Sequence, residues 1–66
     1  MQITLNGEAR EFPSGTTLYG LVQELNLEPE RVAIELNRVI ARRDSWQETT
    51  VESGAEIEIV MFVGGG

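Results

Sequence analysis

The side chains that most often carry enzyme chemistry are missing from this 66-residue sequence, which contains no histidine and no cysteine. No side chain that ordinarily titrates near neutral pH is present to act as a general base, and no thiolate can bind a metal or attack a substrate. Serine needs a partner base, and Ser14, Ser45 and Ser53 have only carboxylates to serve as one. We therefore expect no enzyme site inside the domain, no resident cofactor and no metal centre.

Two charged sets remain as candidate sites. The acidic set recurs every four residues and comprises Asp44, Glu48 and Glu52. On a helix it would form one face and a weak site for a hard cation, but we favour a solvated acidic face because unpaired carboxylates prefer water. The basic set comprises Arg38, Arg42 and Arg43. We expect surface ion pairs from this set rather than an anion site.

The C-terminal residues differ, because Gly64, Gly65 and Gly66 directly follow an apolar run that ends at Val63. At ordinary glycine usage, three such glycines arise by chance in about 3 sequences in 10,000. Glycine has no Cβ and can thread a narrow channel, and four extended residues reach at most ~13 Å. The pattern predicts a flexible tail that carries a carboxylate into another protein's active site. A frayed end or an expression scar is the alternative.

A carboxylate is itself unreactive, so a partner must convert it into a mixed anhydride, for which ATP is the usual source. We expect the Gly66 carboxylate to be the reactive group and Gly65 to lie beside it in the partner's channel. The protein would then be a group carrier, with the chemistry supplied elsewhere.

Periodicity predicts the elements that position this end. Residues 1–5 alternate as in a half-buried strand, Asn6 and Gly7 signal a hairpin turn, and residues 8–12 form the return strand. A strict two-residue turn places Leu5 opposite Glu8, and a bulge is the alternative register.

One helix follows. Its apolar stripe has helical spacing and comprises Leu18, Leu21, Val22 and Leu25. We expect Thr16 or Thr17 to be the N-cap and Asn26 to take the left-handed closing position. Gly20 lowers the helix propensity, and we expect another backbone to approach it closely.

Three further strands are predicted at residues 32–36, 39–41 and 56–63, with a polar stretch around Trp46 before the last one. The inward face of the last strand comprises Ile57, Ile59, Met61 and Val63. Its outward face comprises Glu56, Glu58, Val60 and Phe62. The outward face turns apolar toward the tail, so we expect Val60, Phe62 and Gly64 to contact a partner. Burial of Phe62 in the domain is the alternative.

The order of hairpin, helix, two strands and a last strand predicts an α+β domain with the β-grasp fold of ubiquitin: a mixed sheet crossed by one helix. We assign residues 1–63 to this domain and residues 64–66 to the flexible tail. The net charge of −6 disfavours nucleic acid and anionic membrane and favours partners with basic surfaces, with plain solubility as the alternative. No signal peptide or membrane-spanning run is present, which predicts a cytoplasmic protein.

The whole chain resembles the ThiS family, the sulfur carrier proteins of thiamine biosynthesis. The shared features are a Met-Gln-Ile start, Asn6 with Gly7, the helix stripe, Ala33 and Ile34 followed by Asn37, Ile40, Arg43 with Trp46, Gly54, and Gly65 with Gly66. The double glycine is common to all carriers of this superfamily, whereas the spacing from Asn37 to Trp46 points to the thiamine branch. The chain departs from the family at Arg42 and Ala55, where proline and aspartate are frequent.

The resemblance implies a specific reaction sequence. A ThiF-type activating enzyme would adenylate the Gly66 carboxylate with ATP. Sulfur from a cysteine desulfurase or a related source would then displace AMP and leave a thiocarboxylate. Thiazole synthase, ThiG, would accept that sulfur while it builds the thiazole ring. The chain would be a carrier and not itself an enzyme.

Other functions stay open at this point. The chain could carry sulfur for molybdopterin or for another pathway. A ubiquitin-like protein modifier is a further alternative, although the absence of lysine excludes lysine-linked polymers of this chain. A plain β-grasp interaction module would tolerate loss of the tail, whereas a carrier would not.

Overall fold

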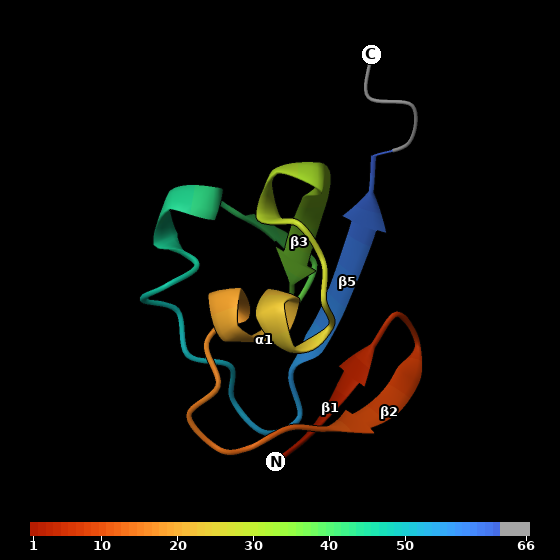
Figure 1. The fold of residues 1–66 in the computed structure, drawn as a ribbon. Coiled ribbons are helices and arrows are strands. Elements are labelled where there is room, and N and C mark those ends of the chain that lie inside the picture. Colours follow the sequence, from red (N-terminus) through yellow and green to blue (C-terminus); the bar gives the residue numbers. More distant parts are fainter. Residues whose placement is uncertain (63–66) are drawn as a thin grey trace.

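The computed structural model describes residues 1–62 (Figure 1). In chain order its elements are β1 (Gln2–Leu5), β2 (Glu8–Glu11), α1 (Leu18–Glu24), the 3-10 helix η1 (Pro29–Arg31), β3 (Val32–Leu36), β4 (Val39–Ala41), the 3-10 helix η2 (Arg43–Ser45) and β5 (Glu56–Met61). The strands form one sheet in the order β2-β1-β5-β3-β4. The β1–β5 pair is parallel and the other neighbours are antiparallel. With α1 across one face, this mixed sheet confirms the predicted β-grasp fold.

The first hairpin has the strict two-residue turn. Asn6 and Gly7 have φ of 50° and 82°, the left-handed values that a type I′ turn requires. Leu5 pairs directly with Glu8, so the alternative with a bulge is wrong. All four residues of β2 are exposed at the edge of the sheet, which explains why its sequence shows little alternation. The two residues between β3 and β4 also have positive φ, at 52° and 71°.

The helix begins and ends as its sequence predicts. Thr17 is the N-cap, and its Oγ1 accepts a hydrogen bond of 3.0 Å from the backbone N–H of Gly20. At the other end Asn26 has φ of 59°. The backbone N–H of Leu27 donates to the carbonyl of Val22 at 3.0 Å, which together with the left-handed Asn26 makes a Schellman ending.

The expected close approach of another backbone to Gly20 is wrong. Within residues 1–62, a Cβ built on Gly20 would contact side-chain atoms of its own helix start, Thr17 Oγ1 at 3.4 Å and Thr16 Cγ2 at 3.5 Å. These are ordinary van der Waals distances, and Gly20 does not have a positive φ. Neither space nor backbone conformation therefore requires glycine at this position.

The core lies between α1 and the sheet. Its buried apolar members among the described residues are Ile3, Leu5, Phe12, Leu18, Leu21, Val22, Val32, Ile34, Trp46, Val51, Ala55, Ile57 and Ile59. Trp46 comes from an otherwise polar segment, yet only 1% of it is exposed. Its indole N–H donates to the Ala41 carbonyl at 2.9 Å, so the ring is buried without leaving its polar atom unpaired. Arg42, where the family often has proline, has φ of −70°, a value that proline also adopts.

Candidate functional site

The end of β5 is the part of the domain from which residues 63–66 continue. β5 lies between β1 and β3, and Figure 1 shows it leading away from the helix-covered body toward the C-terminus. On the β1 side, the side-chain amide of Asn6 forms two hydrogen bonds with the Ile59 backbone. Its Oδ1 accepts from the Ile59 N–H at 2.8 Å, and its Nδ2 donates to the Ile59 carbonyl at 3.3 Å. On the β3 side, Met61 pairs with Val32. The strand is therefore held as far as its last residue, Met61.

The outer face of β5 carries the predicted sequence of acidic and then apolar side chains. Glu56 and Glu58 are exposed, and Val60 and Phe62 are 55% and 52% exposed. The alternative in which Phe62 is buried in the domain is therefore wrong. The remaining predicted site residues, Gly64, Gly65 and Gly66, lie outside the described part of the chain, as does Val63.

Met61 lies on the predicted inward face but is not buried there. Ile57 and Ile59 on that face are buried, but Met61 is 57% exposed. The cause is the length of the helix: α1 ends at Glu24, and Met61 lies beyond the part of the sheet that it covers. Apolar side chains therefore surround the end of β5 on both faces of the sheet.

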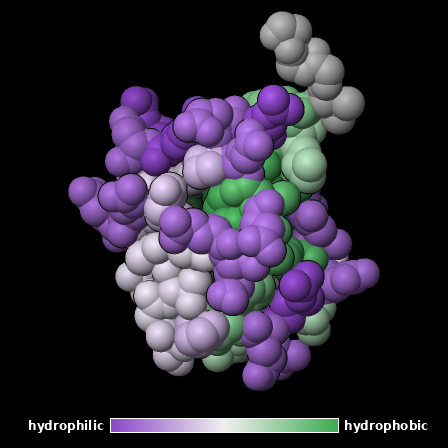
Figure 2. Space-filling model, in the orientation of Figure 1, coloured by the Kyte–Doolittle hydropathy of each residue, from purple (hydrophilic) through white to green (hydrophobic). Residues whose placement is uncertain are grey.

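A shallow groove on the helix side leads to Met61. Its walls come from the first hairpin, the end of α1 and β5, and its lining residues are Leu5, Asn6, Arg10, Leu25, Leu27, Ile59 and Met61. Figure 2 shows that apolar surface is visible between polar side chains on the helix-covered side of the molecule. The volume of about 230 Å³ is below the ~300–1,000 Å³ typical of small-molecule sites. The groove is suited to one or two side chains rather than to a substrate.

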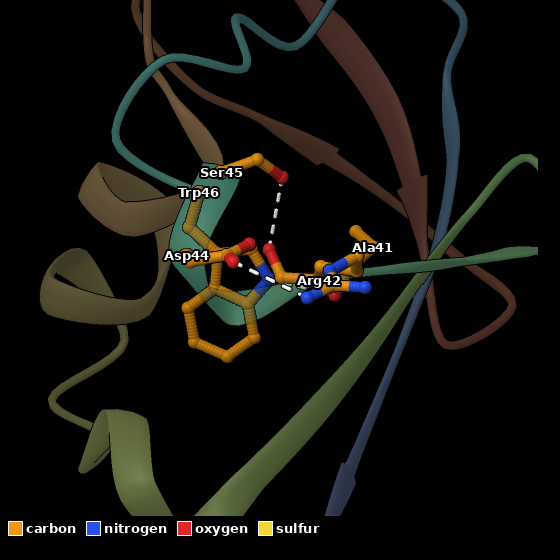
Figure 3. A network of polar contacts seen from close by, with 5 residues as sticks. All are labelled: Ala41, Arg42, Asp44, Ser45 and Trp46. Carbon is orange, nitrogen blue, oxygen red and sulfur yellow. Dashed lines mark hydrogen bonds and ion pairs between the residues drawn. The ribbon is translucent and has the colours of Figure 1, made fainter.

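The basic set does not form one cluster of ion pairs. Arg38 and Arg42 do form the predicted surface pairs. Arg38 lies 3.4 Å from Glu56, and Arg42 lies 3.4 Å from Asp44 (Figure 3). Arg43 was expected to do the same, and that expectation is wrong. Its guanidinium donates instead to backbone carbonyls and lies 5.4 Å from the Trp46 ring.

The acidic set is not arranged as a cation site. The segment that contains it has one turn of 3-10 helix, Arg43–Ser45, followed by turns rather than an α-helix. Residues four apart therefore do not share a face. Within residues 1–62 no three acidic side chains converge in a geometry that could hold a metal ion.

The interior offers no setting for acid–base chemistry in the described part of the chain. None of its buried residues is polar or charged, and desolvation is what most strongly retunes a catalytic acid or base. No helix in this part is long and apolar enough to cross a membrane. The predicted reactive residues lie beyond Phe62, outside this part of the chain.

The mixed sheet crossed by one helix defines a class, the small β-grasp proteins. A family model described as "ThiS family" matches residues 3–66, and the chain belongs to the ThiS family. The crystal structure of a thiamine biosynthesis protein (ThiS) from Geobacter metallireducens is similar to this chain, with a TM-score of 0.86 and 30% sequence identity, and each chain is covered completely.

Two kinds of curated relative match the chain. The sulfur carrier protein ThiS of Escherichia coli is 29% identical, with both sequences covered completely. A thiazole synthase of Magnetococcus marinus is 41% identical over the whole of this chain, and one of Paramagnetospirillum magneticum is 38% identical. The chain spans about a fifth of the length of these two thiazole synthases.

Sequence reasoning missed three residues that shape this site. Asn6 was recognised only as a turn residue, although its amide also holds β5 at Ile59. For Arg43 the sequence predicts only a surface ion pair and a family motif with Trp46, and it indicates neither the backbone carbonyls that Arg43 binds nor the burial of Trp46. A signal was available for Trp46, because a single large aromatic residue in a polar stretch is commonly an anchor in the core.

Proposed function

We propose that this chain is a sulfur carrier in thiamine biosynthesis and that the α-carboxylate of Gly66 is its reactive group. The observation that carries the proposal is the match to the ThiS family, which extends through residue 66 and so includes the glycine end. The assignment of a body (residues 1–63) and a tail (residues 64–66) is part of this proposal.

The proposed chemistry takes place in two steps. One carboxylate oxygen attacks the α-phosphate of ATP in a ThiF-type activating enzyme, which forms an acyl-adenylate and releases pyrophosphate. Hydrosulfide, released from the persulfide of a cysteine desulfurase or a related source by a thiol that is oxidised to a disulfide, then attacks the acyl carbon and AMP leaves. The product is a thiocarboxylate in which one oxygen has been replaced by sulfur. It is ionised at neutral pH and more nucleophilic than the carboxylate, which suits it to sulfur donation.

Thiazole synthase, ThiG, is the proposed acceptor. Support comes from the curated relatives named thiazole synthase, which contain a segment similar to this whole chain. A segment joined to an enzyme in one chain is held near it at high effective concentration. A separate carrier that serves the same reaction needs a docking surface in place of that covalent link.

We propose that Val60, Phe62 and Gly64 form this docking surface. The exposure of Val60 and Phe62 directly before the reactive end supports it, because apolar groups that are left in water near a functional site commonly mark an interface. Val60 and Phe62 would position the body while the glycines enter the partner's channel.

The decisive experiment is the intact mass of a chain ending at Gly66 after incubation with a ThiF-type enzyme, ATP and a sulfur source. The mass should rise by the difference between sulfur and oxygen, and fragmentation should place the change on the last peptide. Omission of ATP should abolish the change, and so should deletion of Gly66. An unchanged mass with cognate partners present would refute the sulfur-carrier function.

A further inference from the structure

The backbone hydrogen bond at the end of the described chain connects Phe62 to a single arginine. The backbone N–H of Phe62 donates to the Arg31 carbonyl at 2.8 Å. On either side of Arg31, the Arg43 guanidinium binds the chain, with Nε 2.9 Å from the Pro29 carbonyl and Nη2 3.0 Å from the Val32 carbonyl. Arg43 therefore holds both ends of the short segment that anchors the end of β5.

That segment has little else to hold it in place. Within η1 only Pro29 is half-buried and the other residues are exposed, so apolar burial stabilises it little. Its own turn contains a backbone hydrogen bond from Arg31 to Glu28 at 2.9 Å and an ion pair between the same residues at 3.0 Å. Both side chains are more than half exposed, and such surface pairs contribute little. Segments with these properties open locally, and the two bonds from Arg43 oppose that opening.

Arg43 is itself held in position by a rigid neighbour. Its guanidinium lies over the ring of Trp46, 5.4 Å from the centroid. Trp46 is buried, and its indole is fixed by the hydrogen bond to Ala41 described above (Figure 3). A planar, stacked guanidinium can direct two donors at two carbonyls, whereas a lysine ammonium is a compact charge without this fork.

The end of β5 depends on the β3 side for its direction. On the β1 side the Asn6 side chain reaches Ile59, and the paired register of β1 with β5 ends earlier, at Ile57. Beyond Ile59 the contacts shown are to the β3 side: Met61 pairs with Val32, and Phe62 bonds to η1. A shift of η1 would therefore change the direction in which β5 ends.

From these contacts we infer that Arg43 is a positioning residue for the reactive end of the chain. It fixes η1, and through the bond between Arg31 and Phe62 it sets the direction in which the chain leaves the body. The consequence for adenylation rests on the proposed function, whereas the effect on Phe62 does not. A displacement of ~1 Å can cost about a hundredfold in rate at a reacting centre.

The first test is the exchange of the Phe62 amide proton with water, measured by NMR. Arg43→Met keeps an apolar stem over Trp46 but removes both hydrogen bonds, and it should accelerate this exchange about tenfold. Arg43→Lys should give nearly the same acceleration because it lacks the fork, and it serves as the test variant if Arg43→Met does not fold. Arg42→Met is the matched control: it removes a neighbouring exposed arginine that pairs with Asp44 and should leave Phe62 unchanged.

A second control separates this local effect from loss of global stability. Val51 is buried in the core and is not among the groups that bind η1, so Val51→Ala should lower the melting temperature without a selective effect on Phe62. Unchanged exchange at Phe62 in both Arg43 variants would overturn the inference, whatever the activity of the protein.

The second test uses pyrophosphate exchange with the activating enzyme. Arg43→Met should lower kcat about tenfold with a small effect on KM, because Val60 and Phe62 are still present for docking. Faster Phe62 exchange with an unchanged kcat would overturn the positioning role. Failure of the wild-type chain to support pyrophosphate exchange would instead refute the proposed function, and the NMR result would still decide whether Arg43 fixes the end of β5.

Discussion

Residues at the end of β5 differ in their contacts: some are buried and stabilise the fold, and others face solvent, where a partner could contact them. Ile57 and Ile59 are buried and belong to the core. Val60 and Phe62 lie in water on the outer face, although the Phe62 backbone is bonded to η1. A side-chain change at Phe62 should therefore affect partner binding more than stability.

Phe62→Ser tests this directly. The free energy of unfolding should fall by less than about 1 kcal/mol because the side chain is half exposed, while affinity for the activating enzyme should fall at least about tenfold if the ring is an anchor. Denaturant melts and titration calorimetry provide the two measurements. Val39→Ser is a suitable control, since Val39 is also an exposed apolar residue but lies on β4. Equal binding by the two variants would argue against a docking role for Phe62.

The terminal glycines should behave in the opposite way to core residues. Deletion of Gly66 leaves a glycine carboxylate that is one residue, or about 3.5 Å, too short, and Gly65→Ala keeps the length but adds a Cβ in the proposed channel. Both variants should unfold within about 0.5 kcal/mol of the wild type and support little pyrophosphate exchange with the activating enzyme. A thermal melt and the exchange assay test both halves. Wild-type rates of pyrophosphate exchange in both variants would show that the terminal glycines have no role in activation.

At the scale of secondary structure, two features reduce stability without a visible role in packing. One is Gly20 within α1, which has neither a positive φ nor a close backbone neighbour among the described residues. The other is the pair Glu35 and Glu58, which are directly opposite each other on β3 and β5. Like charges in that position destabilise a sheet.

Gly20→Ala should stabilise the protein by about 0.5–1 kcal/mol, the difference in helix propensity between the two residues. The new methyl group would make contacts of 3.4 and 3.5 Å, so little strain should offset this gain. Chemical denaturation provides the measurement. A loss of stability would mean that the new methyl disturbs the Thr17 cap beside it.

Glu58→Lys should also be stabilising, because it replaces a repulsive cross-strand pair with an attractive one. The expected gain is between about 0.2 and 1 kcal/mol. Glu48→Lys makes the same change in net charge at a turn residue outside the strands, so the difference between the two variants isolates the pair. Equal melting temperatures in the two variants would indicate that solvent screens the Glu35–Glu58 repulsion.

For the molecule as a whole, the net charge of −6 should act mainly on association. Opposite charge on a partner accelerates encounter, and the effect falls steeply with salt, since the Debye length shrinks from about 10 Å at 0.1 M to about 3 Å at 1 M. The association rate constant with the activating enzyme, measured by stopped flow, should therefore fall about tenfold or more over this range. A rate that does not depend on salt would leave solubility as the role of the charge.

Local signals were enough to predict most of the elements. The first hairpin turn depends on Asn6 and Gly7, which tolerate positive φ, and the limits of α1 depend on Thr17 and Asn26, whose effects act within a few residues. The apolar stripe of α1 and the alternation of apolar residues in β3 indicate directly which side chains face the core. Together with the chain order, these signals led to the β-grasp fold, and the outward positions of Val60 and Phe62 followed from strand parity alone.

Only the tertiary structure decided how much of the sheet α1 covers and which groups far apart in the sequence come into contact. Parity places Met61 on the inner face, but its exposure depends on how far α1 extends over the sheet. Arg43 has the charge of an ion-pairing residue, yet the carbonyls that it binds are 11 and 14 residues away along the chain. Hydrogen-bond partners and burial of this kind arise from long-range packing, which no periodicity in the sequence records.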